Sequence, residues 1–236
     1  MNPARSIGGK AAGVVLAAAV ASSFALPAAS ASSAPLTKAR AHKLAKHINL
    51  DASNFRGFKV HAYQSSKGAK ATEKKYAACV GLAPVFAKAH SDAYDNGKGG
   101  IFSSVTEFVS SRSAARHDAK RAASQRARDC LKQEMTDVAK AVSAQDTKVT
   151  VTPVTEAAVA GIDAIYSVKY TATFTILGYH GTLHGWSIGI SRGNAEVSLN
   201  EIGTMDVPRA NLSNALSTLI ARVKNKVPAK GLPVKH

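Results

Sequence analysis

A run of strict two-residue alternation near the middle of the chain constrains the fold more than any other feature. From Ile162 to Ile176 every even-numbered residue is apolar, and the odd-numbered residues are polar except Ile165. Successive side chains of a strand point to opposite faces of a sheet, so this period is typical of a strand with one buried face. The run therefore predicts a long strand whose even-numbered residues face the protein interior.

The residues that follow predict an antiparallel meander. Gly-Tyr-His-Gly at 178–181 is typical of a turn, and 182–190 alternate again, with Trp186 on one face and Ser187 on the other. A second turn at 192–194 leads into another alternating segment. Three consecutive strands joined by short turns are expected here.

Helical spacing of apolar residues predicts helices over about 73–93, 113–142 and 209–226, and further strands are expected at 60–63 and 101–110. The strands gathered in the second half favour an α+β fold. We expect an antiparallel sheet of about five or six strands, with two long helices and a C-terminal helix packed on it.

The first 31 residues have the layout of a secretory signal. Arg5 and Lys10 precede an apolar run over 11–26, and Ala29 and Ala31 occupy the positions that a signal peptidase reads. That run is shorter than the roughly 20 apolar residues that a membrane span needs, and no later stretch reaches that length. We expect cleavage after Ala31 and a secreted, extracellular protein. The expected division is a signal peptide (1–31), a linker (32–44), a single domain (45–227) and a flexible basic tail (228–236).

Two cysteines, Cys79 and Cys130, are present, and neither stands where a lipid could be attached after the signal. In an oxidising compartment two cysteines most simply pair. A redox thiol would lack its Cys-x-x-Cys partner, and a zinc site would need several more ligands. We expect a disulfide between the first two long helices, with both cysteines facing the interior, and no metal or cofactor.

The charge is strongly positive, at +16. Removing Arg5 and Lys10 with the signal leaves +14, and the excess lies outside a slightly acidic segment at 141–208. Such a balance bears on partners and solubility more than on fold. Export argues against a specific nucleic-acid partner, although charge alone would permit binding in vitro.

Two groups of basic residues are candidate anion-binding sites. In the long helix expected at 113–142, three basic residues fall on one face, opposite an alanine-rich stripe. That face is either an ordinary solvated surface or a binding stripe for a polyanion. The first group is Arg121, Arg128 and Lys132, and the second, in the last helix, is Arg222, Lys224 and Lys226.

Gly185-Trp186-Ser187-Ile188-Gly189 matches the G-x-S-x-G pattern of a nucleophile elbow. That chemistry needs the serine on a strand-to-helix turn, with an acid and then a histidine downstream. Ser187 instead lies in an alternating strand, and His236 is the only histidine after it. We therefore expect no catalytic residue here, and assign the two glycines to close packing against a helix or a neighbouring strand.

His180 and His184 are spaced as two metal ligands would be on a helix. On a strand four residues span about 13 Å, which is too far for one shared ion. Tyr179 and His180, on the expected turn, are instead candidate contact residues for a ligand.

Short motifs resemble a family of actinobacterial secreted proteins and lipoproteins. They are Asn49-Leu50-Asp51, Phe55-Arg56-Gly57-Phe58, Cys79-Val80-Gly81, Ser103-Ser104-Val105, Phe108-Val109-Ser110, Ala114-Ala115 and Cys130-Leu131. Over roughly 45–227 the pattern also resembles the extracellular sensor domain of mycobacterial serine/threonine kinases. That resemblance implies a disulfide-bearing α+β unit with a ligand in a cleft. No kinase domain or anchoring helix accompanies it here, so a signalling role is not carried over.

These observations favour a secreted, non-enzymatic binding domain of the cell envelope or medium, whose partner is an anionic envelope polymer or a small ligand. Two alternatives remain. An uncharacterised hydrolase would be favoured by a deep pocket that holds Ser187 or a histidine–carboxylate pair. A carrier of an apolar ligand would be favoured by an apolar cavity between the sheet and the helices of Cys79 and Cys130. The sequence does not indicate an oligomeric state.

Overall fold

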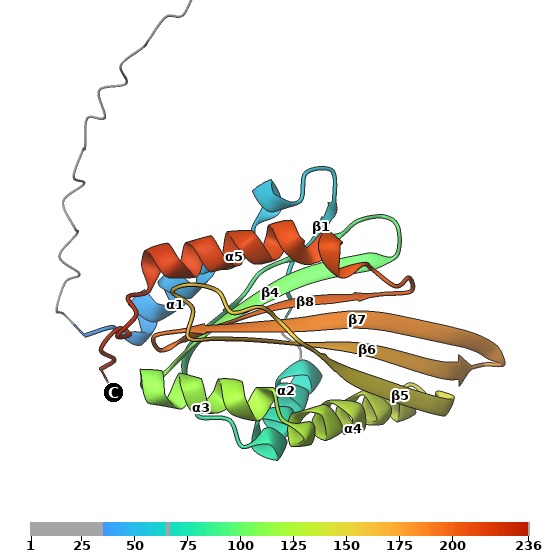
Figure 1. Cartoon of the computed structure of the whole chain (residues 1–236). Helices are drawn as coiled ribbons and strands as arrows, with labels where there is room; N and C mark the ends of the chain where they lie inside the picture. Colours follow the sequence, from blue (N-terminus) through green and yellow to red (C-terminus); the bar gives the residue numbers. More distant parts are fainter. Residues whose placement is uncertain (1–34, 65–66, 236) are drawn as a thin grey trace, which may run out of the picture. The chain divides into compact units, whose positions relative to one another are not determined.

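A computed structural model describes residues 35–64 and 67–235 (Figure 1). The expected signal peptide lies outside the described residues. The helices are α1 (Lys38–Ile48), α2 (Lys67–Val80), α3 (Arg112–Ala122), α4 (Gln125–Ala141) and α5 (Ser213–Lys226), with short 3-10 turns at Ala52–Asn54 and Arg209–Leu212. The strands are β1 (Lys59–His61), β2 (Val85–His90), β3 (Ala93–Asp95), β4 (Gly100–Val109), β5 (Gln145–Val154), β6 (Ala164–Ile176), β7 (Tyr179–Arg192) and β8 (Ala195–Gly203).

The strands form one open antiparallel sheet in the order β1-β3-β4-β8-β7-β6-β5, with β2 added beside β4. The predicted α+β class is confirmed. The sheet has eight strands rather than five or six, because β2, β3 and β5 were not predicted from the sequence.

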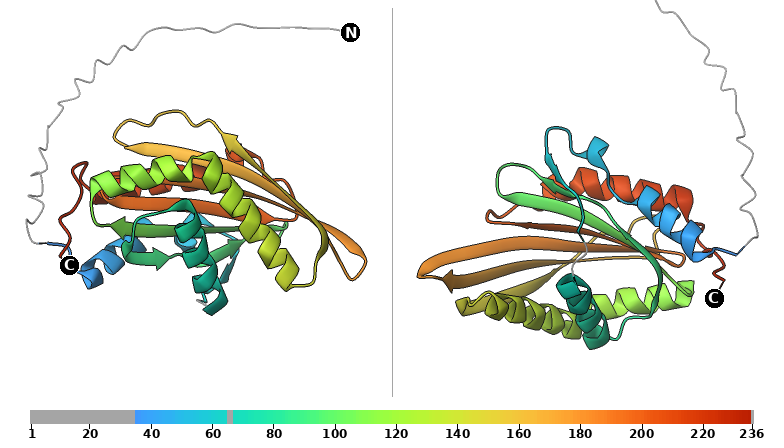
Figure 2. Two further views of the ribbon diagram at one scale, coloured as in Figure 1. Left: turned by 90° about the horizontal axis from the view of Figure 1, so that it is seen from below. Right: turned by 180° about the vertical axis from the view of Figure 1, so that it is seen from behind.

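Helices cover both faces of the sheet. Helices α1 and α5 lie on one face, and α2, α3 and α4 lie on the other (Figures 1 and 2). The main hydrophobic core fills the space between the sheet and the α1–α5 layer, with Ile48, Ile188, Leu199 and Leu219 fully buried. Helices α2, α3 and α4 enclose the candidate site on the other face.

The β6–β7 hairpin is tighter than its sequence suggested. Ile176 pairs with Tyr179, so the turn consists of Leu177 and Gly178, both with positive φ. Positive φ at both central residues is the geometry that matches the twist of a two-residue hairpin. Tyr179 and His180, which were expected on the turn, are instead the first residues of β7.

The helix expected over 73–93 ends at Val80, so that prediction is wrong beyond this residue. Gly81 has φ +80° and closes the helix, because its N–H and that of Leu82 both bond to the carbonyl of Ala77. After Pro84 the chain continues as β2 and pairs with β4.

The single long helix expected over 113–142 is two helices. Helix α3 ends at Ala122, and α4 begins after Ser124, whose hydroxyl accepts a hydrogen bond from the N–H of Ala127. A serine at this position is a favoured N-cap, which explains why a new helix begins there.

The two ends of the domain are joined. Most of the segment expected as a linker is helix α1, which buries Ala41 and Ala45. Leu36 forms an isolated parallel bridge with Val234, and the N–H of Leu232 donates to Asn194 Oδ1 at 2.8 Å. The segment expected as a flexible tail therefore bonds to the rest of the domain over 228–235.

Candidate ligand-binding cavity

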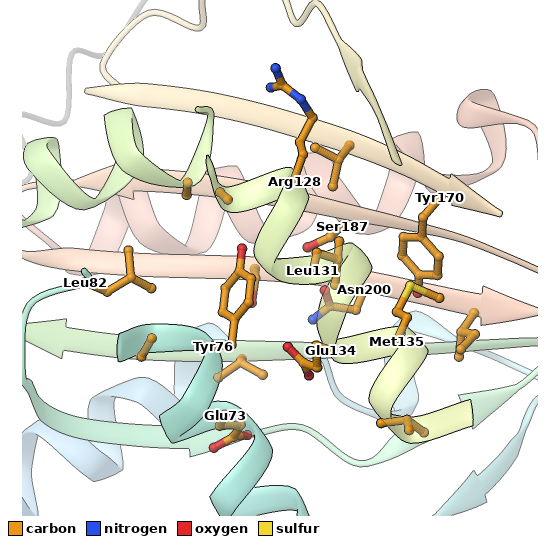
Figure 3. A pocket seen from close by; sticks show the side chains of 18 of the residues that line it. Glu73, Tyr76, Leu82, Arg128, Leu131, Glu134, Met135, Tyr170, Ser187 and Asn200 are labelled. Carbon is orange, nitrogen blue, oxygen red and sulfur yellow. The ribbon is translucent and has the colours of Figure 1, made fainter. Parts of the chain in front are cut away.

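A cavity of about 940 Å³ lies between the sheet and helices α2, α3 and α4 (Figure 3). Strands β4, β6, β7 and β8 contribute its floor, and the three helices contribute its roof. This volume is at the upper end of the range, about 300–1,000 Å³, that small-molecule sites occupy.

The floor is apolar because of the alternation in β6. The even-numbered residues of this strand all point to the cavity side of the sheet, opposite the core that α1 and α5 cover. The sequence therefore predicted the buried face correctly, but this face lines a cavity. The lining residues of β6 are Tyr166, Val168, Tyr170, Ala172, Phe174 and Ile176.

The roof is mainly α4. Leu131, Met135 and Val138 line the cavity at spacings of four and three residues, so they share one face of the helix. Tyr76 of α2 and Leu82 from the segment after it add to the same lining. Together with β6 they make most of the cavity lining apolar.

Polar side chains interrupt this lining near the centre. Ser187 and Asn200 are direct cross-strand partners on β7 and β8, and both line the cavity. Glu134 of α4 lines the same cavity (Figure 3). Burial and, to a smaller degree, the nearby Glu73 raise the pKa of Glu134 to about 7.

A second carboxylate, Glu196 of β8, lines the cavity near α3. Burial raises its pKa to about 9, and the charges of Asp118 and Glu107 add to this effect. Burial also raises the pKa of Asp118, which lines the same cavity, so the lining of this strongly basic protein contains three carboxyl groups with raised pKa values.

An ion-pair network flanks the cavity. Lys88 of β2 lies 2.7 Å from a carboxylate oxygen of Glu73 and 3.0 Å from one of Glu107, so it joins α2 to β4. Burial lowers the pKa of Lys88, but the two carboxylates outweigh burial, and the net direction is upward. His90 also lies beside Glu73, at 3.5 Å.

Two long-range links hold α2 over the sheet. The predicted Cys79–Cys130 disulfide is confirmed and joins α2 to α4, with the Cα atoms 6.0 Å apart. The expectation that both cysteines face the interior is wrong for Cys79, which is exposed, while Cys130 is buried. In addition, both carboxylate oxygens of Asp118 accept from the N–H of Ala83, at 3.0 and 2.9 Å.

The first basic group lies on the helical layer that roofs the cavity. Arg121 lies in the last turn of α3 and donates to the carbonyl of Gly81. The break between α3 and α4 separates it from Arg128 and Lys132 on α4. Arg128 and Lys132 both line a small hollow of about 220 Å³ between α4 and β5. In Figure 3 the guanidinium group of Arg128 points away from the other labelled side chains.

The second basic group lies on the opposite face of the sheet, on α5. Arg222 donates to the carbonyl of Asn49 and to the side chains of Asp51 and Asn54, so it ties α5 to the segment after α1. Lys224 and Lys226 are exposed. The six basic residues therefore do not form one surface.

The candidate contact residues Tyr179 and His180 lie at the tip of the β6–β7 hairpin. Tyr179 is 80% exposed and the adjoining Leu177 is 92% exposed. His180 Nδ1 lies 3.0 Å from the hydroxyl of Thr175 on β6. Ile176, next to the turn, lines the cavity, so this tip borders one end of it.

Ser187 lies in the cavity but in the middle of β7, not on a strand-to-helix turn. No histidine is among the described residues that line the cavity. Within 35–64 and 67–235 no group of three or more histidine, cysteine or acidic residues is placed to hold a metal ion.

Sequence reasoning missed Glu134 and Glu196 as cavity residues. Glu134 stands three residues after Leu131 and four before Val138, so a helical projection places it on the apolar face of α4. Glu196 alternates with Ala195 and Val197, which places it on the face that Ser187 shares. A carboxylate on an apolar face was the available signal for Glu134. Glu196 shares its face with Ser198 and Asn200, so no comparable signal marked it in the sequence.

Comparison with known proteins gives one match among solved structures. The chain is similar to the extracellular domain of PknH from Mycobacterium tuberculosis, with 12% sequence identity and a TM-score of 0.38, over 79% of this chain and 95% of that chain. Similarity at this level establishes neither a shared fold nor a shared function. No protein family and no curated protein matches the chain. No helix in the described part of the chain is long and apolar enough to cross a membrane.

Proposed function

We propose that this chain is a non-catalytic, extracellular binding domain that takes a small ligand with an apolar body into the cavity between the sheet and helices α2–α4. The observation that carries the proposal is the cavity itself, with its volume of about 940 Å³ and the apolar lining contributed by β6 and α4. A ligand with an apolar body would remove this apolar lining from water, and that removal favours binding.

The way in which the cavity is built supports binding rather than catalysis. Its apolar residues lie on long strands and on one helix, and the Cys79–Cys130 disulfide and the Asp118–Ala83 contact hold the roof in place. Ser187 projects from mid-strand, where the backbone geometry differs from that of a nucleophile elbow. A pre-organised cavity of this kind lowers the conformational cost of binding.

The extracellular assignment rests on two features. An intramolecular disulfide is typical of an oxidising compartment, and the first 31 residues have the layout of a secretory signal.

The test is binding of N-phenyl-1-naphthylamine, whose fluorescence rises in an apolar site. We expect saturable binding to the wild type and at least tenfold weaker binding to Leu131→Trp, which fills the cavity from α4. Ala221→Trp, an exposed position of α5 on the far face of the sheet, is the matched control and should bind as the wild type does. Thermal melts establish that each variant is folded. Absence of binding to the wild type, or equal binding to folded Leu131→Trp, would overturn the proposal.

A second binding mode, for an anionic polymer on the outer surface, is supported by Arg128 and Lys132. Both side chains border the hollow between α4 and β5, where several anionic groups of a polymer could be contacted at once.

A further inference from the structure

The cavity lining contains two buried polar atoms that have no hydrogen-bond partner among residues 35–64 and 67–235. Ser191 is 1% exposed and lines the cavity, and its hydroxyl has no hydrogen-bond partner among the described residues. Within the described part of the chain, oxygen Oε1 of Glu196 is also buried without a hydrogen-bond partner. Buried polar groups are nearly always hydrogen-bonded, so two adjacent exceptions within a cavity require an explanation.

These two groups form one subsite. Ser191 and Glu196 are direct cross-strand partners on β7 and β8. Directly opposed residues point to the same face of a sheet, with Cβ atoms about 4.5–5.5 Å apart. Both residues line the cavity, so a single ligand group can meet the hydroxyl and the carboxyl together.

The charges around this subsite favour a cation. Glu107 of β4 pairs with Glu196 across the sheet, and Asp118 of α3 lies close enough to affect the pKa of Glu196. The only described cation shown bonded to any of these three carboxylates is Lys88, which Glu107 already shares with Glu73. The titratable and charged groups that face Glu196 are Glu107 (β4), Asp118 (α3) and Tyr166 (β6). Behind them, Lys88 (β2) lies beside Glu107, Arg121 and His117 (α3) act on Asp118, and Tyr76 (α2) acts on Tyr166.

We propose that the cavity ligand is an amphiphilic amine, with its ammonium group bound by Glu196 and Ser191 and its apolar body against β6 and α4. This inference rests on the proposed function and names the class of ligand. The ammonium group supplies the hydrogen-bond donors that the two oxygens lack, and its charge offsets that of the carboxylate.

Binding should release a proton. Burial and the neighbouring carboxylates raise the pKa of Glu196 to about 9, so at pH 7 the empty cavity holds this group as a neutral acid. An incoming ammonium ion favours the ionised form, and the displaced proton goes to solvent. The balance is one carboxylic acid and one ammonium ion giving one ion pair and one free proton.

Isothermal titration calorimetry with three ligands of equal chain length tests this. Decylamine, 1-decanol and decanoate share an apolar body and differ in head group. We expect decylamine to bind at least tenfold more tightly than 1-decanol, and decanoate to bind most weakly. Titrations in buffers of different ionisation enthalpy should show close to one proton released at pH 7 for decylamine and none for 1-decanol.

Glu196→Gln should remove the advantage of decylamine and its proton release, while 1-decanol affinity stays the same. Glu201→Gln is the matched control, because Glu201 is a fully buried carboxylate of the same strand, whose position in β8 places it on the opposite face of the sheet. Equal affinities of wild type for all three ligands, tighter binding of decanoate, or an unchanged preference in Glu196→Gln would overturn the amine assignment and leave the proposed function standing. Failure of all three ligands to bind would overturn both.

Discussion

The ring of Tyr166 lies over Gly189 across the β6–β7 pair, so closely that a Cβ on Gly189 would stand 2.1 Å from the Tyr166 Cζ atom. Tyr170 covers Gly185 in the same way, with 2.2 Å to its Cζ atom. The two glycines of the G-x-S-x-G pattern therefore make room for the aromatic rings of the neighbouring strand, as the strand interpretation predicted.

Gly189→Ala should destabilise the fold by about 1–3 kcal/mol, the usual cost of overpacking a well-packed site. Urea unfolding measures this loss, and Ser187→Ala, on the same face of β7, should change the free energy of unfolding far less. In a Tyr166→Ala background the cost of Gly189→Ala should largely disappear. An undiminished cost in the double variant would show that the ring contact is not its cause.

Removing the disulfide should loosen α2. The bond closes a loop of 51 residues between Cys79 and Cys130, for which loop entropy predicts a stabilisation of about 4 kcal/mol. Cys79→Ala/Cys130→Ala should unfold at a lower urea concentration than the wild type and bind N-phenyl-1-naphthylamine more weakly, because α2 forms part of the roof. Wild type with dithiothreitol should behave like the double variant. Unchanged stability in both cases would contradict this role.

Stability should fall as pH rises from about 5 to 9. The pKa values of Glu134 and Glu196 are raised to about 7 and about 9 from an ordinary value of 4.5, so the folded protein binds more protons than the unfolded chain in this range. The free energy of unfolding therefore decreases with pH. Glu196→Gln should flatten the upper part of the Tm profile, whereas Asp146→Asn, at an exposed position, should leave it unchanged. A wild-type Tm that rises from pH 6 to 9 would contradict the prediction.

Binding to anionic polymers should be weak and salt-sensitive, because each exposed charge contributes about 0.2–1 kcal/mol and is screened beyond about 8 Å. On a polyanionic resin, Arg121→Glu/Arg128→Glu/Lys132→Glu should elute at lower salt than the wild type. Lys224→Glu/Lys226→Glu should change the salt concentration at elution independently of the triple variant, since α5 lies on the other face of the sheet. Equal retention of the triple variant and the wild type would show that Arg121, Arg128 and Lys132 form an ordinary solvated surface and do not bind the polymer.

Export should remove residues 1–31. Ala29 and Ala31 stand at the −3 and −1 positions before Ser32. Mass spectrometry of the exported protein should identify Ser32 as the first residue. A retained Met1 or a lipid-modified N-terminus would contradict the cleavage prediction.

The best-predicted elements are those whose signals are local in the sequence. The alternation in β6 depends on residues two positions apart. The presence of a turn after it is also a local signal, although the turn consists of Leu177 and Gly178 and not of 178–181. By contrast, the apolar residues of 85–90 fit a helix or a strand by their spacing alone. Pairing with β4 decides this segment, and that strand lies about 20 positions later in the sequence.

The candidate site also has a part that the sequence predicts and a part that it does not. Two cysteines allow only one intramolecular pairing, so the disulfide could be predicted from the sequence. The sequence could not predict that Arg128 lies on the cavity side of the sheet and Lys224 on the opposite side. The path of the chain between distant helices determines which face of the sheet each helix covers.

By itself, the sequence determined that even-numbered residues of 166–176 share an apolar face and that Cys79 and Cys130 can pair; Ile162, which the same alternation included, precedes β6 and packs against the main core. Only the tertiary structure decided that this face lines a cavity and that Glu196 and Ser191 meet within it. The physical reason is that periodicity specifies which side of a strand avoids water, but not how far away the covering layer lies. That separation depends on contacts between distant residues, such as Asp118 with Ala83 and Cys79 with Cys130.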